Sequence, residues 1–182
     1  MTQEIIFFNE YLLTTPLGEL AIWLDKSNIL QFVGWVEHRA LTQQQLTSFY
    51  KTKTIKLQLT KQSNPVIQAI SEYFQGNLNA INQLIVADFG TPFQKQVWQA
   101  LRQIPAGTTC SYSEIAKQLG NPLACRAVGM ANHNNPIAIV VPCHRVIGKN
   151  KKLTGYAGGL EKKQWLLAHE KHFTYHDLLA LT

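Results

Sequence analysis

An apolar, mostly β-branched run at residues 137–141 is followed by Pro142, Cys143, His144 and Arg145. Such a run predicts a buried strand, and Pro142, which has no N–H to donate, predicts the end of that strand. A lone cysteine is more often buried and inert. However, positive neighbours lower the pKa of a thiol, and the thiolate is the reactive form. The string therefore predicts a reactive Cys143 where a rigid element meets a turn.

Composition excludes several classes of protein. The 182 residues suit one domain or two small ones, and 46% apolar residues are enough for a core. The sequence has no stretch of about 18 consecutive apolar residues, so no membrane span is predicted. The first residues lack the basic segment of a secretory signal, so such a signal is not expected. The chain has three cysteines, Cys110, Cys125 and Cys143, and no C-x-x-C pair. This argues against a disulfide framework or a zinc site and predicts a reducing, cytoplasmic location.

The positive charge lies in one half of the chain. Residues 1–88 hold 6 Lys/Arg and 7 Asp/Glu, a net charge of −1, whereas residues 89–182 hold 11 and 4, a net charge of +7. The half that contains Cys143 therefore carries all the excess. A polyanionic partner, with nucleic acid first, is the natural interpretation, although basic surface can also serve solubility alone.

Residues 1–88 are predicted to form a small α/β domain. Apolar and β-branched segments predict three strands, at residues 11–14, 19–24 and 29–36. Asn64 and Pro65 have the character of an N-cap and a first helical residue, and Gly76 is a plausible stop for that helix. His38 stands apart from other chemistry-bearing residues, so a surface position is predicted for it. No set of catalytic residue types gathers in this half.

Residues 89–182 are predicted to form a second domain around a helix-turn-helix. Thr91 begins one helix, and Ser111 with Glu114 has capping-box spacing for a second. The pair Asn121-Pro122 opens a third helix after a short, glycine-containing turn. Two short helices joined in this way are typical of a helix-turn-helix, whose second helix reads DNA.

A glycine-rich loop and a closing helix complete the chain. The basic segment 148–152 leads into glycines that permit a folded-back loop at 154–159. The closing helix is predicted from about residue 160 to Glu170, which it carries at its end. Three leucines are expected on its core face, Leu160, Leu166 and Leu167.

Five motifs follow one another in the second half: Arg126-Ala127-Val128-Gly129, Asn134-Asn135-Pro136, residues 142–146, residues 155–159 and residues 165–170. Together they resemble the O6-alkylguanine-DNA alkyltransferase family. The resemblance implies an RNase-H-like α/β domain followed by a winged-helix-like domain. It also implies a single, irreversible transfer of an alkyl group from guanine O6 in double-stranded DNA to Cys143. We expect a monomer without cofactor or metal; whether O4-methylthymine is accepted stays open.

The resemblance assigns four residues to the chemistry. The Cys143 thiolate attacks the alkyl carbon, and His144 is the base. Adjacent side chains in an extended segment point to opposite sides, so a bridging water between the two is predicted. Glu170 is expected to orient His144, the alternative being a solvated carboxylate at a helix end. Tyr112 is expected to position the flipped nucleotide and to protonate the leaving base, the alternative being a core tyrosine.

Further residues are expected at the DNA. Arg126 resembles the side chain that fills the space left by the flipped base, although a plain phosphate contact is the alternative. Asn135 is expected in the turn beside the active site, where it is otherwise an ordinary turn residue. Ser111, at the start of the first predicted helix of the helix-turn-helix, and Ala124, on the second, are also assigned to DNA binding.

The base pocket is expected to be completed by Val146, Tyr156 and Ala157. The backbone carbonyls of Val146 and Cys143 are expected to accept from the exocyclic amine, and the Ala157 N–H is expected to donate to O6. Thr154 stands where other relatives have glycine. Its β-branched side chain predicts a narrow pocket that disfavours benzyl-sized adducts.

Two other classes of function compete with the alkyltransferase. A helix-turn-helix protein without chemistry, such as a damage sensor, would keep its activity without Cys143. A Cys–His–Glu hydrolase would turn over and would use the Gly158-Gly159 amides as an oxyanion hole. The hydrolase leaves the basic half without a role.

Overall fold

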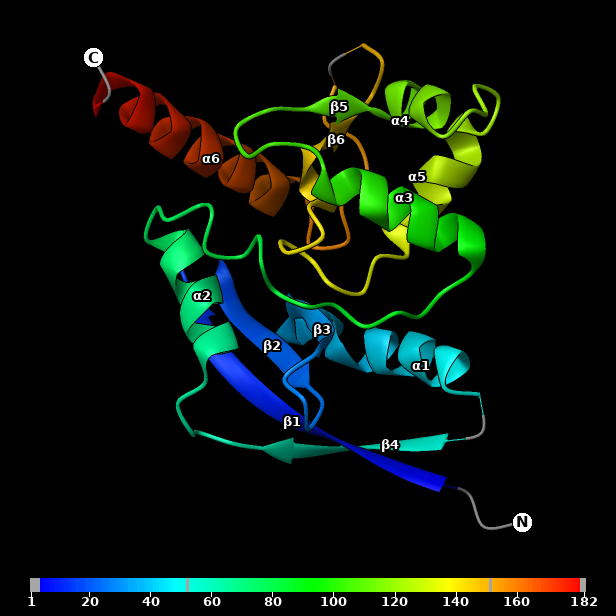
Figure 1. Cartoon of the computed structure of the whole chain (residues 1–182), viewed down its shortest axis with the longest axis vertical. Helices are drawn as coiled ribbons and strands as arrows, with labels where there is room; N and C mark the ends of the chain where they lie inside the picture. The colour runs from blue at the N-terminus through cyan, green and yellow to red at the C-terminus, as the bar shows by residue number, and fades with distance from the viewer. Residues whose placement is uncertain (1–3, 52, 151, 181–182) are drawn as a thin grey trace.

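The computed structural model describes residues 4–51, 53–150 and 152–180. It is a mixed α/β structure in which the first half forms a sheet with flanking helices and the second half is mainly helical (Figure 1). Two expectations rest partly on residues outside this description. They are the lack of a basic segment at the first residues of the chain and the basic loop, which includes Lys151. None of the helices described has the length and apolar character needed to cross a bilayer.

A four-stranded sheet forms most of the first half. Its strands are β1 (Glu4–Thr15), β2 (Gly18–Leu24), β3 (Leu30–Trp35) and β4 (Lys53–Leu59). They lie in the order β3-β2-β1-β4, with β4 parallel to β1 and the other pairs antiparallel. The three predicted strands are confirmed: residues 11–14 and 19–24 lie within β1 and β2, and β3 covers all but the two end residues of the third, predicted at 29–36. The predicted elements did not include β4, although apolar residues alternate along it.

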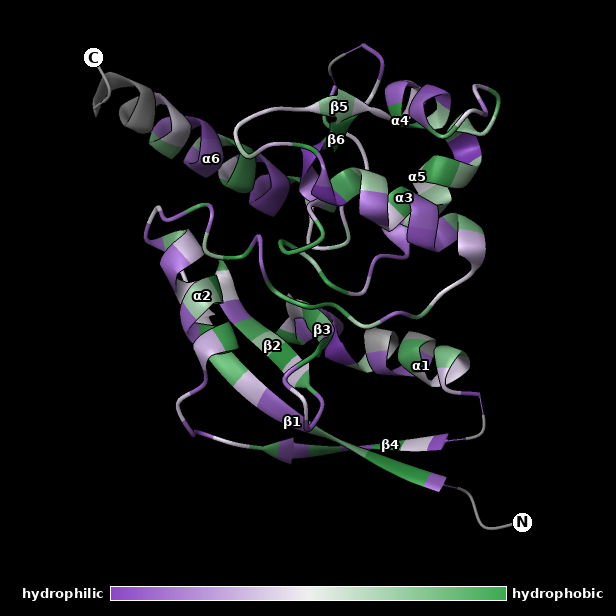
Figure 2. Ribbon diagram, viewed as in Figure 1, coloured by the Kyte–Doolittle hydropathy of each residue, from purple (hydrophilic) through white to green (hydrophobic). Residues whose placement is uncertain are grey.

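Helices cover both faces of this sheet. The helix α1 (Arg39–Phe49), which follows the short 3₁₀ helix η1 (Val36–His38), packs Leu46 with Trp23 and Phe32 on one face. The sequence did not predict α1 because its apolar residues are sparse. The other face packs against α2 (Pro65–Phe74) and the second half in one continuous core, and β2 shows its hydrophobic character in Figure 2. As predicted, Asn64 caps α2, and Gly76 follows its end with φ +106°.

The second half consists of short elements around the core. They are α3 (Pro92–Arg102), β5 (Cys110–Ser111), α4 (Tyr112–Gln118), α5 (Cys125–His133), the 3₁₀ helix η2 (Cys143–Arg145), β6 (Val146–Ile147) and α6 (Leu160–Ala180). Ser111 forms the capping box that its spacing predicted, and Thr91, which was predicted only to begin a helix, forms one with Gln94 as well. However, α5 begins at Cys125 with Ala124 as N-cap, later than expected, because a turn occupies residues 122–124.

The closing helix differs from its prediction in two ways. It continues to Ala180, so Glu170 lies in the middle of the helix rather than at its end. Leu160 is exposed rather than in the core, whereas Leu166 is fully buried. Leu160 stands at the first position of the helix, where the residue is 48% exposed.

The predicted strand at residues 137–141 is wrong. The segment is buried but turns back on itself, with Val141 N donating to Ile137 O at 3.0 Å and with Ile139 at φ +71°. Only Ile137 makes a bridge, to Val33 of β3. A short apolar run signals burial, and burial here comes from side-chain packing rather than from a strand ladder.

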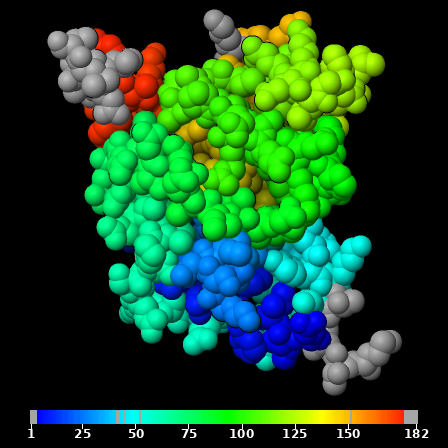
Figure 3. Space-filling view, in the orientation of Figure 1, coloured from blue at the N-terminus to red at the C-terminus, as the bar shows by residue number. Residues whose placement is uncertain are grey.

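This turn attaches the second half to the sheet. Val33 N donates to Pro136 O at 3.1 Å, and Ala138 N donates to Val33 O at 2.8 Å. Figure 3 shows a hollow framed by green segments, with residues near 140 (gold) at its bottom. A cavity of about 240 Å³ is lined in part by Val140 and Arg145. The edge strand β3 therefore supports the segment that presents Cys143.

Candidate active site

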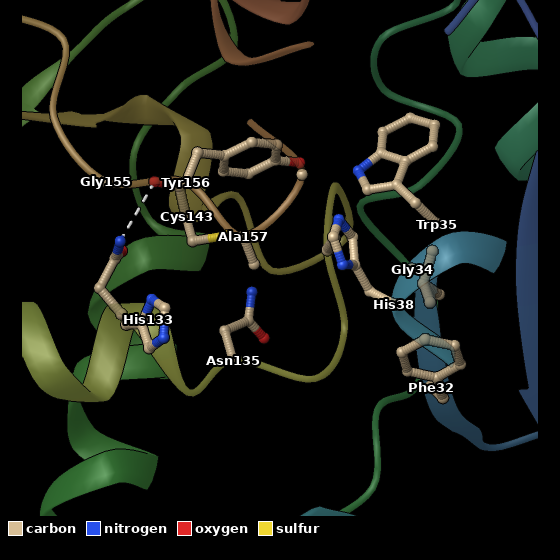
Figure 4. A pocket seen from close by; sticks show the side chains of 14 residues that line it. Phe32, Gly34, Trp35, His38, His133, Asn135, Cys143, Gly155, Tyr156 and Ala157 are labelled. Carbon is tan, nitrogen blue, oxygen red and sulfur yellow. Dashed lines mark hydrogen bonds between the residues drawn. The ribbon is translucent and has the colours of Figure 1, made fainter. Parts of the chain in front are cut away.

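Cys143 lies at a pocket between the two halves of the chain. The pocket encloses about 50 Å³, enough for a few water molecules, and Cys143 is 6% exposed. Figure 4 shows Cys143, Asn135 and Tyr156 on one side of it and Trp35 and His38 on the other. The sulfur therefore faces a small, enclosed space whose walls come from distant parts of the sequence.

The expectation of a lowered pKa for Cys143 is wrong. Burial raises the pKa of the thiol, and a hydrogen bond from Asn135 and the charge of Lys163 only partly oppose this. Arg145, which the sequence placed beside the thiol, turns away and donates to Ile104 O at 2.6 Å. The resting thiol therefore needs a base to become nucleophilic.

His144 and Glu170 form a buried pair. Their Nε2 and Oε1 atoms lie 2.8 Å apart, and both side chains are fully buried. Burial lowers the pKa of His144, although Glu170 opposes this. An ionised carboxylate only accepts, so Nε2 carries the proton and Nδ1 is the basic nitrogen. Among the described residues, Nδ1 has no hydrogen-bond partner.

Because η2 is a helical turn, the premise that Cys143 and His144 lie in an extended segment is wrong. The local geometry of a 3₁₀ turn does not place adjacent side chains on opposite faces as a strand does. Because Nε2 of His144 is hydrogen-bonded to Glu170, this nitrogen is not available for a direct hydrogen bond to the Cys143 thiol.

Four groups converge on the Glu170 carboxylate. In addition to His144, it accepts from Arg145 Nε at 3.0 Å, Tyr73 Oη at 2.7 Å and Gly107 N at 3.0 Å. Burial raises the pKa of Glu170, but His144 and Arg145 outweigh this and hold it well below its usual range. Glu170 is therefore charged at neutral pH and accepts hydrogen bonds from all four groups.

Lys163 is a site residue that the sequence did not reveal. It is fully buried, and its Nζ donates to Val146 O and Thr154 O, both at 2.6 Å. Burial lowers its pKa to about 8. The expected acceptor at Val146 thus already binds one donor, although a carbonyl has a second lone pair.

Asn135 holds the turn before Cys143. Its Oδ1 accepts from Ile137 N at 3.0 Å, and its Nδ2 donates to Val141 O at 2.9 Å. It also lines the pocket. The structure thus places Asn135 beside Cys143, as the sequence predicted, and gives its amide a bracing role in addition.

The predicted DNA residues lie on α4, on α5 and just before them. Tyr112 is half-buried, and burial raises its pKa, so it stays protonated near neutral pH. Arg126 is exposed in the first turn of α5, and Ala124 is half-buried at its N-cap. Ser111 uses its side chain to cap α4. The charge of Cys143 contributes to the raised pKa of Tyr112, so these two side chains lie near each other.

Thr154 and Ala157 occupy different parts of the loop over the site. Ala157 and Tyr156 line the Cys143 pocket. Thr154 is exposed and lies outside that lining, and its side chain hydrogen-bonds to Tyr112. Thr154, the residue expected to narrow the pocket, is therefore not among the residues that line it.

The first half contributes to the pocket, although no set of catalytic residue types was predicted there. Trp35 and His38 both line it, and His38, for which a surface position was predicted, is half-buried. Trp35 Nε1 and Tyr156 Oη are buried without a hydrogen-bond partner among the described residues. No local pattern could have revealed this, because the approach depends on how the two halves pack.

The comparisons with known proteins agree with this geometry. Residues 92–172 match the family described as 6-O-methylguanine DNA methyltransferase, DNA binding domain. The methylated-DNA–protein-cysteine methyltransferase of Salmonella typhimurium is 47% identical over 87% of this chain and 92% of its own length. The described residues contain no group of three His, Cys, Asp or Glu side chains that could hold a metal ion.

Solved structures are similar over almost the whole chain. The O6-methylguanine methyltransferase of Mycobacterium tuberculosis has a TM-score of 0.71 and 37% identity, covering 91% of this chain and 93% of that one. A structure of the same organism's protein in complex with DNA has a TM-score of 0.66 and 34% identity, covering 91% and 94%. The resemblance inferred from five sequence motifs is thus confirmed, and this chain belongs to the methylated-DNA–protein-cysteine methyltransferase family.

Proposed function

We propose that this protein repairs DNA by transferring the alkyl group of O6-alkylguanine to its own Cys143, once and irreversibly. Transfer to a protein cysteine is the activity named for its relatives. The observation that supports Cys143 as the acceptor is its position: it lines a pocket and is directly followed by His144 of the His144–Glu170 pair. By contrast, Cys125 is exposed on α5, and burial raises the pKa of Cys110, which lies beside the Glu114 carboxylate.

The reaction proceeds in two linked steps. The Cys143 proton passes through a water molecule to Nδ1 of His144, and Glu170 stabilises the resulting imidazolium. The thiolate then forms an S–C bond while the C–O6 bond breaks, and the electron pair leaves with the guanine. Tyr112 donates a proton to the departing base, a contribution made only in the transition state.

DNA is the macromolecular partner, bound by the basic second half. We propose that α4 and α5 form the helix-turn-helix of a winged-helix-like domain at residues 89–182, and that residues 1–88 form an RNase-H-like domain. The target base is extruded from double-stranded DNA, because its O6 cannot otherwise reach a thiol in an enclosed pocket. The protein acts as a cytoplasmic monomer.

Intact mass spectrometry tests this function. Incubation with a duplex that contains O6-methylguanine is expected to add about 14 Da, the mass of CH₂, once per protein molecule. Peptide mapping is expected to place the addition on Cys143. Turnover without an adduct would instead support a hydrolase, and binding without an adduct would support a sensor.

Replacing Arg126 with alanine is expected to slow transfer from duplex DNA by roughly 10- to 100-fold, because the flipped base loses the side chain that occupies its place in the stack. Transfer from free O6-methylguanine should change little. Single-turnover rates on both substrates provide the measurement. The matched control, Lys117→Ala, removes an exposed charge from α4 and should affect only binding and its salt dependence. Equal slowing by the two variants would leave Arg126 a phosphate contact.

Thr154 is expected to disfavour large adducts. Wild-type protein should react more slowly with O6-benzylguanine than with O6-methylguanine in DNA, and Thr154→Gly should reduce this difference by roughly tenfold, on the order of one lost methylene-scale contact. Thr154→Ser is the control, since it keeps the hydroxyl next to Tyr112 and removes only the methyl group. Equal rates with both adducts in wild type and in Thr154→Gly would reject the prediction.

A further inference from the structure

Three side chains donate to a single oxygen of Glu170. Oε1 lies 2.8 Å from His144 Nε2, 2.7 Å from Tyr73 Oη and 2.8 Å from an Arg145 terminal nitrogen. A carboxylate oxygen has about two lone-pair directions. The three donors therefore share the lone pairs of one oxygen, and each donor weakens the hydrogen bonds that the other two make to it.

Tyr73 comes from the opposite half of the chain. It lies on α2, 97 residues from Glu170, and its side chain is fully buried. Its backbone is also bound to α6, because its carbonyl oxygen lies 2.8 Å from His169 Nε2. Burial and the Glu170 charge raise the pKa of Tyr73 well above its usual value, so the hydroxyl is always a donor. Tyr73 is thus a fixed, neutral donor aimed at the catalytic carboxylate.

The position of the His144 proton depends on this oxygen. Burial lowers the pKa of His144, the Glu170 charge raises it, and the charges of Arg145 and Lys163 lower it. The ionisable groups that face the His144–Glu170 pair from the surrounding elements are Tyr73, Cys143, Arg145, Tyr156 and Lys163. Of these, Tyr73 and Arg145 hydrogen-bond to the same Oε1 as His144.

We infer that Tyr73 is a positioning residue of the transfer reaction: by donating to Glu170 Oε1, it weakens the pull of that oxygen on His144 and keeps His144 free to accept the Cys143 proton. A carboxylate that gave its whole charge to His144 would hold the imidazole in its protonated form, and a protonated base cannot act. This inference rests on the proposed role of His144 as the base. It gives the first half of the chain a direct part in the chemistry.

Tyr73→Phe removes the hydroxyl and keeps the ring in the core. The pH at which His144 titrates, followed by NMR of histidine-labelled protein, is expected to rise by roughly one unit, the effect of losing a hydrogen bond to a charged group. In the pH profile for single-turnover transfer from O6-methylguanine DNA, the midpoint of the acidic limb should move to higher pH by the same amount. Tyr11→Phe is the matched control. Tyr11 is another buried tyrosine of the first half, and its hydroxyl accepts from Asn64 at 3.4 Å, away from the site.

A second variant tests the opposite sign. 3,5-Difluorotyrosine at position 73 is a stronger donor and keeps the side-chain shape, so it should lower the titration of His144. This result supports the inference even if Tyr73→Phe does not fold. An unchanged titration in either folded variant, or a rate loss equal at every pH, would reduce Tyr73 to a structural residue and overturn the inference. Failure of the wild-type protein to form an adduct on Cys143 would instead reject the proposed function.

Discussion

Replacing Cys143 with alanine is expected to abolish alkyl transfer completely, since Cys143 is the one cysteine among the residues that line this pocket and a thiolate is a far stronger nucleophile than a neutral imidazole or a phenol. Binding to DNA should persist, because Cys143 is 6% exposed and the proposed DNA-facing Arg126 is unaffected. Intact mass spectrometry after incubation with O6-methylguanine DNA measures the first effect, and titration of a labelled duplex measures the second.

The other two cysteines serve as controls. Cys110→Ala and Cys125→Ala should each form the adduct at close to the wild-type rate, because neither thiol faces the pocket. An adduct of about 14 Da on the Cys143→Ala protein would contradict the assignment of the acceptor. If Cys143→Ala protected cells fully against DNA alkylation, the result would favour the alternative of a damage sensor that binds DNA without chemistry.

Glu170→Gln is expected to produce the second large effect. The variant should lose transfer activity by roughly 10²- to 10⁴-fold, the usual contribution of a general base, because His144 loses the charge that stabilises its protonated form. It should also lower the free energy of unfolding by about 3–5 kcal/mol, since the Arg145 guanidinium stays buried without its counter-charge. Single-turnover rates and denaturant unfolding provide the two measurements. A variant with wild-type activity would remove Glu170 from the mechanism.

The same carboxylate predicts how stability depends on pH. The pKa of Glu170 in the folded protein lies below its unfolded value, so the unfolded state binds more protons in between. Its contribution to stability is therefore fully present above about pH 4.3 and is lost as the pH falls towards the folded-state value. Stability of Glu170→Gln should fall less steeply over this range. The control Glu161→Gln, at an exposed position of α6, should follow the wild type; identical acid unfolding of Glu170→Gln and wild type would contradict the prediction.

Local patterns in the sequence predicted the elements that local forces stabilise. The side chains of Asn64, Thr91 and Ser111 each accept from a backbone N–H in the first turn of the helix that follows, so these helix starts can be predicted from a few neighbouring residues. The apolar and β-branched segments that predicted β1, β2 and β3 are equally local. By contrast, α1 has few apolar residues, and its helix owes more to packing on the sheet than to its own pattern.

The sequence by itself determined the family, the identity of the reactive segment and the order of its motifs, because these are strings of residue types. Only the tertiary structure decided the chemistry around Cys143. It raised the pKa of the thiol by burial, turned residues 137–141 away from a strand and brought Trp35, Tyr73 and Lys163 to the site. Burial and hydrogen bonding act between atoms that are close in space, and separations as long as the 97 residues between Tyr73 and Glu170 leave no local trace in the chain.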